Sequence, residues 1–186
     1  MITCLITFVP LHYYEVVLRN AVSEGIAAVY SSNWHLDQNF IYSLDQKNRD
    51  RLSVAIATAK RSSGLTNPTI GSVIAELTLF FWESLFKVSY GQIIWDHHLD
   101  NLFTFSPSFL HTSRKRQIIS DATKAIRLIR NRIAHHEPIF NDSKYKHTQI
   151  INDINKIVSW RCQDTAKWLL DRTKVNKHLK KKPIFI

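Results

Sequence analysis

Apolar residues recur at helical spacing along most of the chain. From about Leu11 to Val29 they fall three or four positions apart, and Glu15 lies four residues before Arg19 on the polar side. This spacing places the apolar side chains on one helix face, and opposite charges one turn apart support the same helix. A second segment with this pattern starts near Asp45 and ends at the "RSSG" stretch, 61–64. We predict an amphipathic helix for each segment.

The segment "NPTIGSVIAELTLFFWESLF" (67–86) is apolar on nearly all sides. Asn67 is a favourable N-cap, and Pro68 is tolerated in the first turn of a helix. A helix with apolar residues around most of its circumference is buried in a core or in an oligomer interface. The pattern predicts one buried aromatic helix here. The segment that follows, 90–107, is predicted to be irregular or to form a short helix.

Two more helices are predicted after this segment. One begins at Ser113 and ends near His136, because Pro138 disfavours the helical conformation at Glu137. The last runs from about Tyr145 to Arg172. No convincing strand pattern is present, so the sequence predicts an all-α fold.

The predicted elements fit one domain. A length of 186 residues is typical of a single domain with a sizeable core. We expect a bundle of about five helices over 1–173, followed by a basic tail over 174–186.

The charge is unevenly distributed along the chain. The formal net charge is +10. Up to Leu110 there are seven Lys and Arg against nine Asp and Glu, a balance of −2; from His111 onward there are 18 against six, a balance of +12. This asymmetry favours an anionic partner for the second half, with RNA, DNA or a membrane surface as candidates. A solvated basic tail is the plain alternative.

The remaining sequence features concern the location of the protein in the cell. No apolar run approaches the roughly 20 residues of a membrane-spanning helix. The apolar start lacks a basic n-region and a small-residue cleavage site, so it is not predicted to be a signal peptide. Cys4 and Cys162 are too few and too far apart for a disulfide framework or a zinc ribbon. We expect a cytoplasmic protein without a membrane partner.

The stretch "RLIRNRIAHHEPIF" (127–140) concentrates charge and imidazole at a predicted helix end. At about 100° per residue, Asn131 and His135 share a helix face, whereas Arg130 lies about 140° from His135. Arg130 and His135 therefore converge only if the helix end distorts or if a second protomer brings its own copy alongside.

Four interpretations of this stretch compete. His135 could stabilise the C-terminal end of its helix, where the helix dipole favours a cation. A metal site is disfavoured, because adjacent histidines such as His97 and His98 point apart on a helix and no HExxH motif is present. Acid–base catalysis by His135 with charge stabilisation by Arg130 is the third interpretation. The fourth is phosphate binding without chemistry, by Arg127, Arg130 and Arg132.

The sequence "RNRIAHHEPIF" resembles the signature of HEPN-domain proteins of the abortive-infection (Abi-like) group. That signature has an arginine, a polar residue and then a histidine after four to six residues, which correspond here to Arg130, Asn131 and His135. Three further segments are similar to helices of the family: "HYYEVVLRNAV", "ELTLFFWESLF" and "DINKIVSWRCQDTAKWL". The resemblance spans most of the chain, from His12 to Leu170. Family members usually have a few dozen more residues before the first of these helices.

The resemblance implies a metal-independent endoribonuclease without a cofactor, of a phage-defence or toxin–antitoxin type system. Such proteins dimerise, and two motif helices form one composite site at which the RNA 2′-hydroxyl attacks the adjacent phosphate. His135 would then move a proton, Arg130 would stabilise the phosphorane charge, and Asn131 would orient one of them. The expected partners are RNA and a second copy of the chain, and an antitoxin protein is a further candidate partner.

Other residues are candidates for smaller roles. His136 could share the proton transfer or cap the helix, and Glu137 could hold the His135 ring. Glu83 could reach the motif arginines, although Lys87 four residues later is a simpler partner. The candidate contacts to RNA phosphates are Arg127, Arg132, Arg114, Lys115 and Arg116. Two alternatives stay open: a non-catalytic RNA-binding or regulatory module of the same fold, and a DNA-binding helical protein.

Overall fold

The computed structural model describes residues 2–135 and 147–173, and within these ranges the chain consists of helices joined by turns and loops and contains no strand. The all-α prediction is therefore confirmed. In chain order the α-helices are α1 Ile2–Val29, α2 Gln38–Ser43, α3 Gln46–Ser63, α4 Ile70–Glu76, α5 Leu79–Ser84, α6 Asp96–Leu102, α7 Thr112–Ala134, α8 His147–Arg161 and α9 Gln163–Thr173. Short 3₁₀ turns span Trp34–Leu36 and Val88–Tyr90, and a π-helical turn, Gly91–Trp95, leads directly into α6. The predicted basic tail, 174–186, lies outside the described residues.

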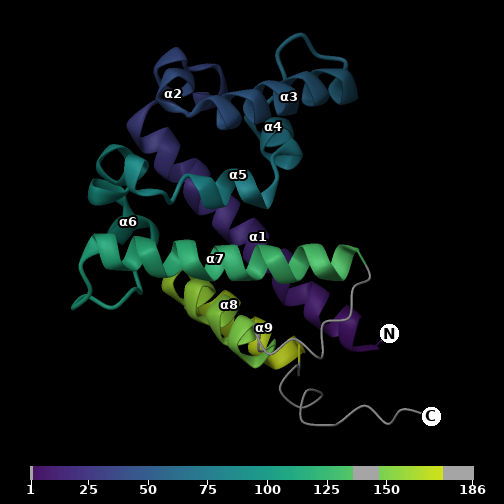
Figure 1. The fold of residues 1–186 in the computed structure, drawn as a ribbon, viewed down its shortest axis with the longest axis vertical. Coiled ribbons are helices and arrows are strands. Elements are labelled where there is room, and N and C mark those ends of the chain that lie inside the picture. Colours follow the sequence, from purple (N-terminus) through teal and green to yellow (C-terminus); the bar gives the residue numbers. More distant parts are fainter. Residues whose placement is uncertain (1, 136–146, 174–186) are drawn as a thin grey trace.

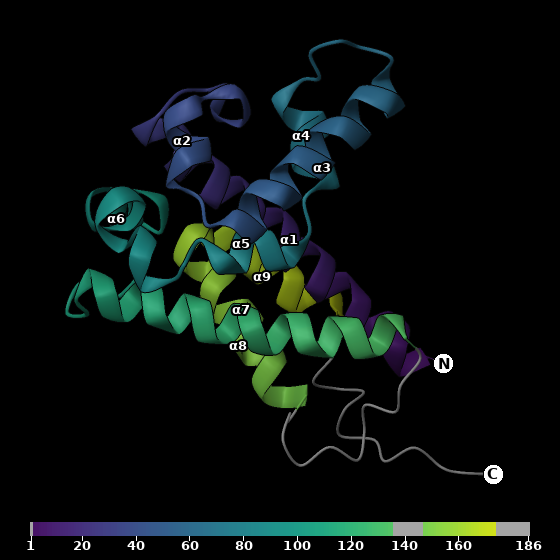
Figure 2. The same cartoon turned by 45° about the horizontal axis from the view of Figure 1, so that its top comes forward.

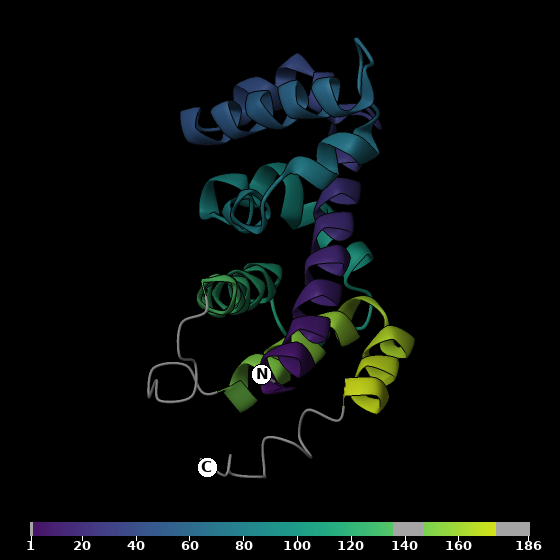
Figure 3. The same ribbon diagram turned by 90° about the vertical axis from the view of Figure 1, so that its right-hand side faces the viewer.

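The long helix α1 forms the axis of the molecule. It runs through the fold behind α7 (Figure 1), and α5, α6, α7, α8 and α9 all contact it. The helices α2, α3 and α4 form a layer at one end of α1, and α7 and α8 lie toward the other end (Figures 2 and 3). One end of α1 thus lies at the layer of α2, α3 and α4, and the other end lies toward α7 and α8 (Figures 2 and 3).

Apolar residues of α1 explain its central position. Tyr14, Leu18, Val22 and Ile26 follow one another at intervals of four and are fully buried. They pack in one core with aromatic side chains of other helices and turns, namely Trp34, Phe40, Phe81, Trp82, Phe86, Trp95 and Phe103. The helix starts at Ile2 rather than at the predicted Leu11, and it contains Pro10. No helix of the described part is both long enough and apolar enough to cross a bilayer.

The prediction for α3 is confirmed at both ends. The side chain of Asp45 accepts a hydrogen bond from the backbone N–H of Asn48 at 2.9 Å, which satisfies one of the open donors of the first turn. Gly64 ends the helix with φ of 68°, a left-handed conformation that glycine adopts without a Cβ clash.

The prediction of one continuous aromatic helix over 67–86 was wrong. Leu77 and Thr78 adopt extended backbone angles, which separate α4 from α5. The cap predicted at Asn67 was also wrong, because Thr69 accepts the N–H of Ser72 instead. The break allows Leu77, Leu79 and several aromatic residues of α5 to be buried at once, which one straight helix would not permit.

The predicted last helix, from Tyr145 to Arg172, is also divided. Cys162 separates α8 from α9, although its N–H still bonds the carbonyl of Val158 at 2.8 Å. Thr165 donates its hydroxyl to the Cys162 sulfur at 3.2 Å, and this hydrogen bond lowers the pKa of the thiol. Because of these two breaks and the short helices α2 and α6, the described residues contain nine α-helices instead of about five.

Candidate functional site

The helix α7 carries the motif residues at its C-terminal end. Its first turn is capped by His111, whose Nδ1 accepts the N–H of Ser113 at 3.3 Å. One face of the helix is buried in the core through Ile119, Ala122, Ile126, Ile129 and Ile133. The predicted helix end near His136 is close to the observed end, where His135 is the C-cap and donates its N–H to the carbonyl of Asn131 at 3.0 Å.

Arg130 and His135 lie at the surface, whereas Asn131, the residue after Arg130, is half-buried. The Arg130 side chain is 45% exposed, and its nearest carboxylate is Glu15 of α1, with 4.0 Å between Arg130 Nε and Glu15 Oε2. That distance is too long for a hydrogen bond. No residue of the described ranges accepts a hydrogen bond from the terminal guanidinium nitrogens of Arg130, which leaves a charged donor group available to an anion at this end of α7.

Arg127, one turn earlier, is held in the fold. Its guanidinium forms an ion pair with Glu83 of α5, and both side chains are less than one-fifth exposed. A second contact joins Arg127 Nη2 to Glu83 Oε1 at 3.5 Å. The guanidinium also lies 4.9 Å from the ring centroid of Phe80, within cation–π range. The simple Glu83–Lys87 pairing is not formed, because Lys87 Nζ bonds Asp45 Oδ2 at 3.0 Å instead.

The other residues that were predicted to contact RNA phosphates are also of two kinds, some buried in the fold and some not. Lys115 is buried and pairs with Asp100 at 2.7 Å. Arg116 is buried and donates to the backbone carbonyl of Phe86. Arg114 is exposed in the first turn of α7, and Arg132 is half-buried near its end. Of the five residues expected to contact RNA, Lys115, Arg116 and Arg127 therefore serve the fold, and we do not carry them into the site.

The two auxiliary candidates, His136 and Glu137, lie outside the described residues. Within the described part, no three His, Cys, Asp or Glu side chains come close enough together to hold a metal ion. His97 and His98 lie on α6, where His97 is exposed and His98 is half-buried.

A buried hydrogen-bond pair connects α7 with α1 about two helical turns before the motif. The hydroxyls of Tyr14 and Thr123 lie 2.6 Å apart, and Thr123 also donates to the carbonyl of Ile119 at 2.6 Å. Complete burial raises the pKa of Tyr14 well above its usual value, so the phenol stays protonated. This pair fixes the register of α1 on α7 and thereby brings Glu15, the next residue, toward Arg130.

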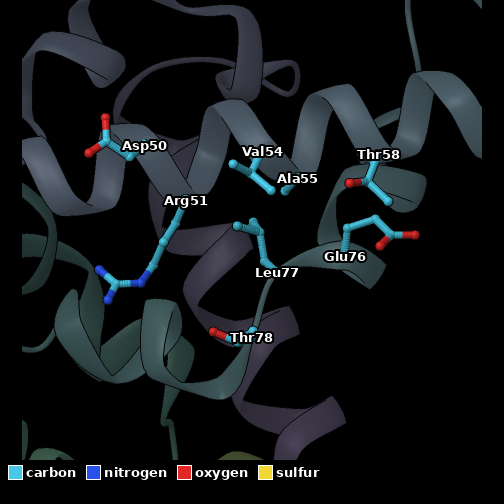
Figure 4. Close-up of a pocket in the computed structure, with 8 residues that line it drawn as sticks. All are labelled: Asp50, Arg51, Val54, Ala55, Thr58, Glu76, Leu77 and Thr78. Carbon is cyan, nitrogen blue, oxygen red and sulfur yellow. The ribbon is translucent and has the colours of Figure 1, made fainter.

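Two hollows lie away from the motif. One, of about 280 Å³, lies between α3 and the α4–α5 break and is lined by Asp50, Arg51, Val54, Ala55, Thr58, Glu76, Leu77 and Thr78 (Figure 4). The other, of about 360 Å³, is an open depression beside Tyr13, Asp164, Thr165 and Trp168. Neither contains a motif residue, and Arg130 and His135 are exposed at the end of α7.

Comparison with known proteins leaves the family open. No family model, curated protein or solved structure significantly matches the chain. The function therefore has to be argued from the residues themselves.

Sequence reasoning missed Glu15. In the sequence its obvious partner is Arg19, one helical turn away, but no ion pair joins the two side chains, and Glu15 faces Arg130 across the α1–α7 contact. The only available signal was a carboxylate on the first helix, because nothing in the sequence indicates which turn of α1 meets which turn of α7.

Proposed function

We propose that the protein is a metal-independent endoribonuclease of the HEPN type. The observation that carries the proposal is the grouping of Arg130, Asn131 and His135 at the exposed end of α7. Lys115, Arg116 and Arg127, earlier in the same helix, are tied to carboxylates and a carbonyl of the fold. A guanidinium and an imidazole with no strong structural partner are the groups needed to bind a phosphate and to move a proton.

In the proposed reaction the RNA 2′-oxygen attacks the adjacent phosphorus. The 2′-hydroxyl loses its proton, a bond forms between the 2′-oxygen and phosphorus, and the bond to the 5′-oxygen breaks. The products are a 2′,3′-cyclic phosphate and a 5′-hydroxyl. Arg130 stabilises the additional negative charge of the phosphorane, and His135 protonates the departing 5′-oxygen. Asn131 orients one of these groups.

The position of the motif on a regular helix supports a site shared by two protomers. The helix α7 continues to Ala134, so Arg130 and His135 point about 140° apart within one chain. A second copy, with its α7 alongside, would bring the Arg130 of one chain to the His135 of the other. On the basis of the resemblance to Abi-like proteins, we also propose a role in phage defence or a toxin–antitoxin system.

The first experiment tests the substrate class. The purified chain is incubated with labelled RNA and with DNA of the same sequence, each in excess chelator. We expect the RNA alone to be cut, with cyclic phosphate and 5′-hydroxyl ends, because DNA has no attacking hydroxyl. RNA that is bound but not cut would identify a non-catalytic module, and equal binding of DNA without cleavage would identify a DNA-binding protein.

A second experiment tests the shared site. Arg130→Ala and His135→Ala proteins are each inactive alone under this proposal. Mixing and re-equilibrating them produces heterodimers in which one composite site has both groups intact, so activity returns. Two different affinity tags show whether heterodimers have formed. A mixture that contains heterodimers but stays inactive contradicts the shared site.

A further inference from the structure

Glu15 is a carboxylate with unusually little compensation for its burial. Its side chain is only 22% exposed, and its one charged neighbour within 4 Å in the described part is Arg130. No hydrogen bond to Glu15 is present in that part of the structure. Glu83, by contrast, is bound by Arg127 through both carboxylate oxygens. The Glu15 carboxylate therefore has no described hydrogen-bond partner in the fold and lies beside a motif arginine.

Two pairs of charged groups on neighbouring helices are engaged with each other and not with Glu15. On α8, Asp153 and Lys156 pair with each other at 3.1 Å. On α5 and α7, Glu83 and Arg127 form their own pair. In the described part of the chain, Arg130 is the charged residue within 4 Å of Glu15, so a phosphate held by Arg130 would lie next to the Glu15 carboxylate.

The proposed reaction needs two proton transfers. One group must remove the proton of the 2′-hydroxyl, and another must give a proton to the 5′-oxygen. His135 supplies the second transfer and cannot supply the first in the same step. The structure offers a second group at the site that neither the motif nor the resemblance names.

We propose that Glu15 is the general base of the nuclease, an inference that rests on the proposed function. The Glu15 carboxylate accepts the 2′-hydroxyl proton while the 2′-oxygen bonds to phosphorus. The bond from phosphorus to the 5′-oxygen breaks as the His135 imidazolium protonates that oxygen. Glu15 ends the step protonated and His135 ends it neutral, and exchange with water restores both. Arg130 keeps the phosphate beside Glu15 throughout.

The test compares Glu15→Gln with a matched control on the same helix. Glu24 is also on α1, and it is ion-paired with Arg161, so Glu24→Gln removes an equivalent charge away from the motif. We expect Glu15→Gln to lower kcat by about 10²-fold or more, the usual size of a lost proton-transfer group, and Glu24→Gln to leave it unchanged. Glu15→Asp should recover part of the rate because it keeps a carboxylate.

The pH profile separates a base from a residue that only positions Arg130. The acid side of a plot of kcat/KM against pH reports the essential base of the free enzyme. Glu15→Gln should flatten this limb, and Glu15→Asp should restore it. Rates are divided by the folded fraction measured at each pH, so the limb remains decisive even if a variant is less stable. A limb unchanged in Glu15→Gln overturns the inference.

A modified substrate separates the base from the acid. In an RNA whose scissile 5′-oxygen is replaced by sulfur, the leaving group departs as a thiolate without needing a proton. His135→Ala should recover most of its lost rate on this substrate, whereas Glu15→Gln should not. Rescue of Glu15→Gln by sulfur, or wild-type rates in Glu15→Gln on ordinary RNA, would leave the nuclease standing and reject Glu15 as its base. A wild-type chain that cuts no RNA overturns the proposed function together with this inference.

Discussion

Basic residues along α7 serve two different purposes. Lys115, Arg116 and Arg127 are bound by Asp100, a backbone carbonyl and Glu83. Arg130, one turn after Arg127, and His135, at the C-cap, have at most one distant carboxylate in the described structure. The difference teaches that a count of positive charge along a helix overstates its capacity to bind phosphate, because a buried cation is part of the fold.

The same contrast holds for histidines. His35 is fully buried, and its Nε2 lies 3.3 Å from the carbonyl oxygen of Pro68. His135 is exposed at a helix end. The buried ring should affect stability and the exposed ring should affect activity, and each of the following experiments tests one side of the contrast.

The largest effect is expected from His135→Ala. The variant should lose RNA cleavage by about 10²–10⁴-fold, because it removes a positioned proton donor. Its melting temperature should stay within a few degrees of wild type, since the ring is exposed and a helix-end interaction contributes only about 1 kcal/mol or less. Cleavage rate and thermal unfolding are measured on the same preparation. A destabilised but fully active variant would end the assignment of catalysis to this motif.

Arg127→Ala should give the opposite result. Removing one partner of a largely buried pair leaves Glu83 uncompensated and should lower the free energy of unfolding by about 3 kcal/mol. Cleavage per folded molecule should change little. Urea denaturation gives the stability, and Lys124→Ala, an exposed cation of the same helix, is the control with an expected change within about 0.5 kcal/mol. Replacing Arg127 and Glu83 together by methionine should recover most of the loss.

The salt dependence of RNA binding should respond to Arg130 and not to Lys115. Each phosphate contact on a single strand contributes about 0.7 to the slope of log K against log salt. Arg130→Ala should reduce the slope by about that amount. Lys115→Met should leave the slope unchanged, because that lysine pairs with Asp100 inside the protein. Equal slopes for wild type and Arg130→Ala would place the phosphate elsewhere.

The smallest effect concerns His35. Burial lowers the pKa of His35 below its ordinary value of 6.5, so the folded state binds fewer protons than the unfolded state as pH falls. The stability it contributes is complete above about pH 6.5 and is lost as the pH falls toward the folded-state pKa. Denaturation midpoints at pH 7.5 and 5.5 should therefore differ less in His35→Gln than in wild type. His97→Gln, at an exposed position, should keep the wild-type difference.

The apolar pattern predicted the helices that are long and one-sided. Both ends of α3 and the end of α7 were predicted within one or two residues, since a capping aspartate, a glycine and a proline mark them. The breaks at Leu77–Thr78 and Cys162 were not predicted, because neither contains a glycine or a proline. They accompany tertiary packing that a local pattern does not encode: α4 packs on α3 and α5 on α1 and α7, whereas α8 and α9 both pack on α1.

The site was predictable in part for the same reason. Arg130, Asn131 and His135 could be found because they are close in sequence. The burial of Lys115 and Arg116 could not, because long basic side chains reach polar partners from positions beside an apolar face. Glu15 could not be identified from the sequence, because its distance to Arg130 is set by how α1 packs on α7.

The Glu83–Arg127 pair has a consequence for the evolution of this chain. A change at position 83 alone or at 127 alone leaves a buried charge without its partner, so the two positions should drift together. Positions 130 and 135 have no such tie, and under the proposed function they are maintained only while RNA cleavage is useful. A descendant released from that selection should therefore lose the arginine and the histidine first, keep the buried pair, and survive as a folded domain that binds without cutting.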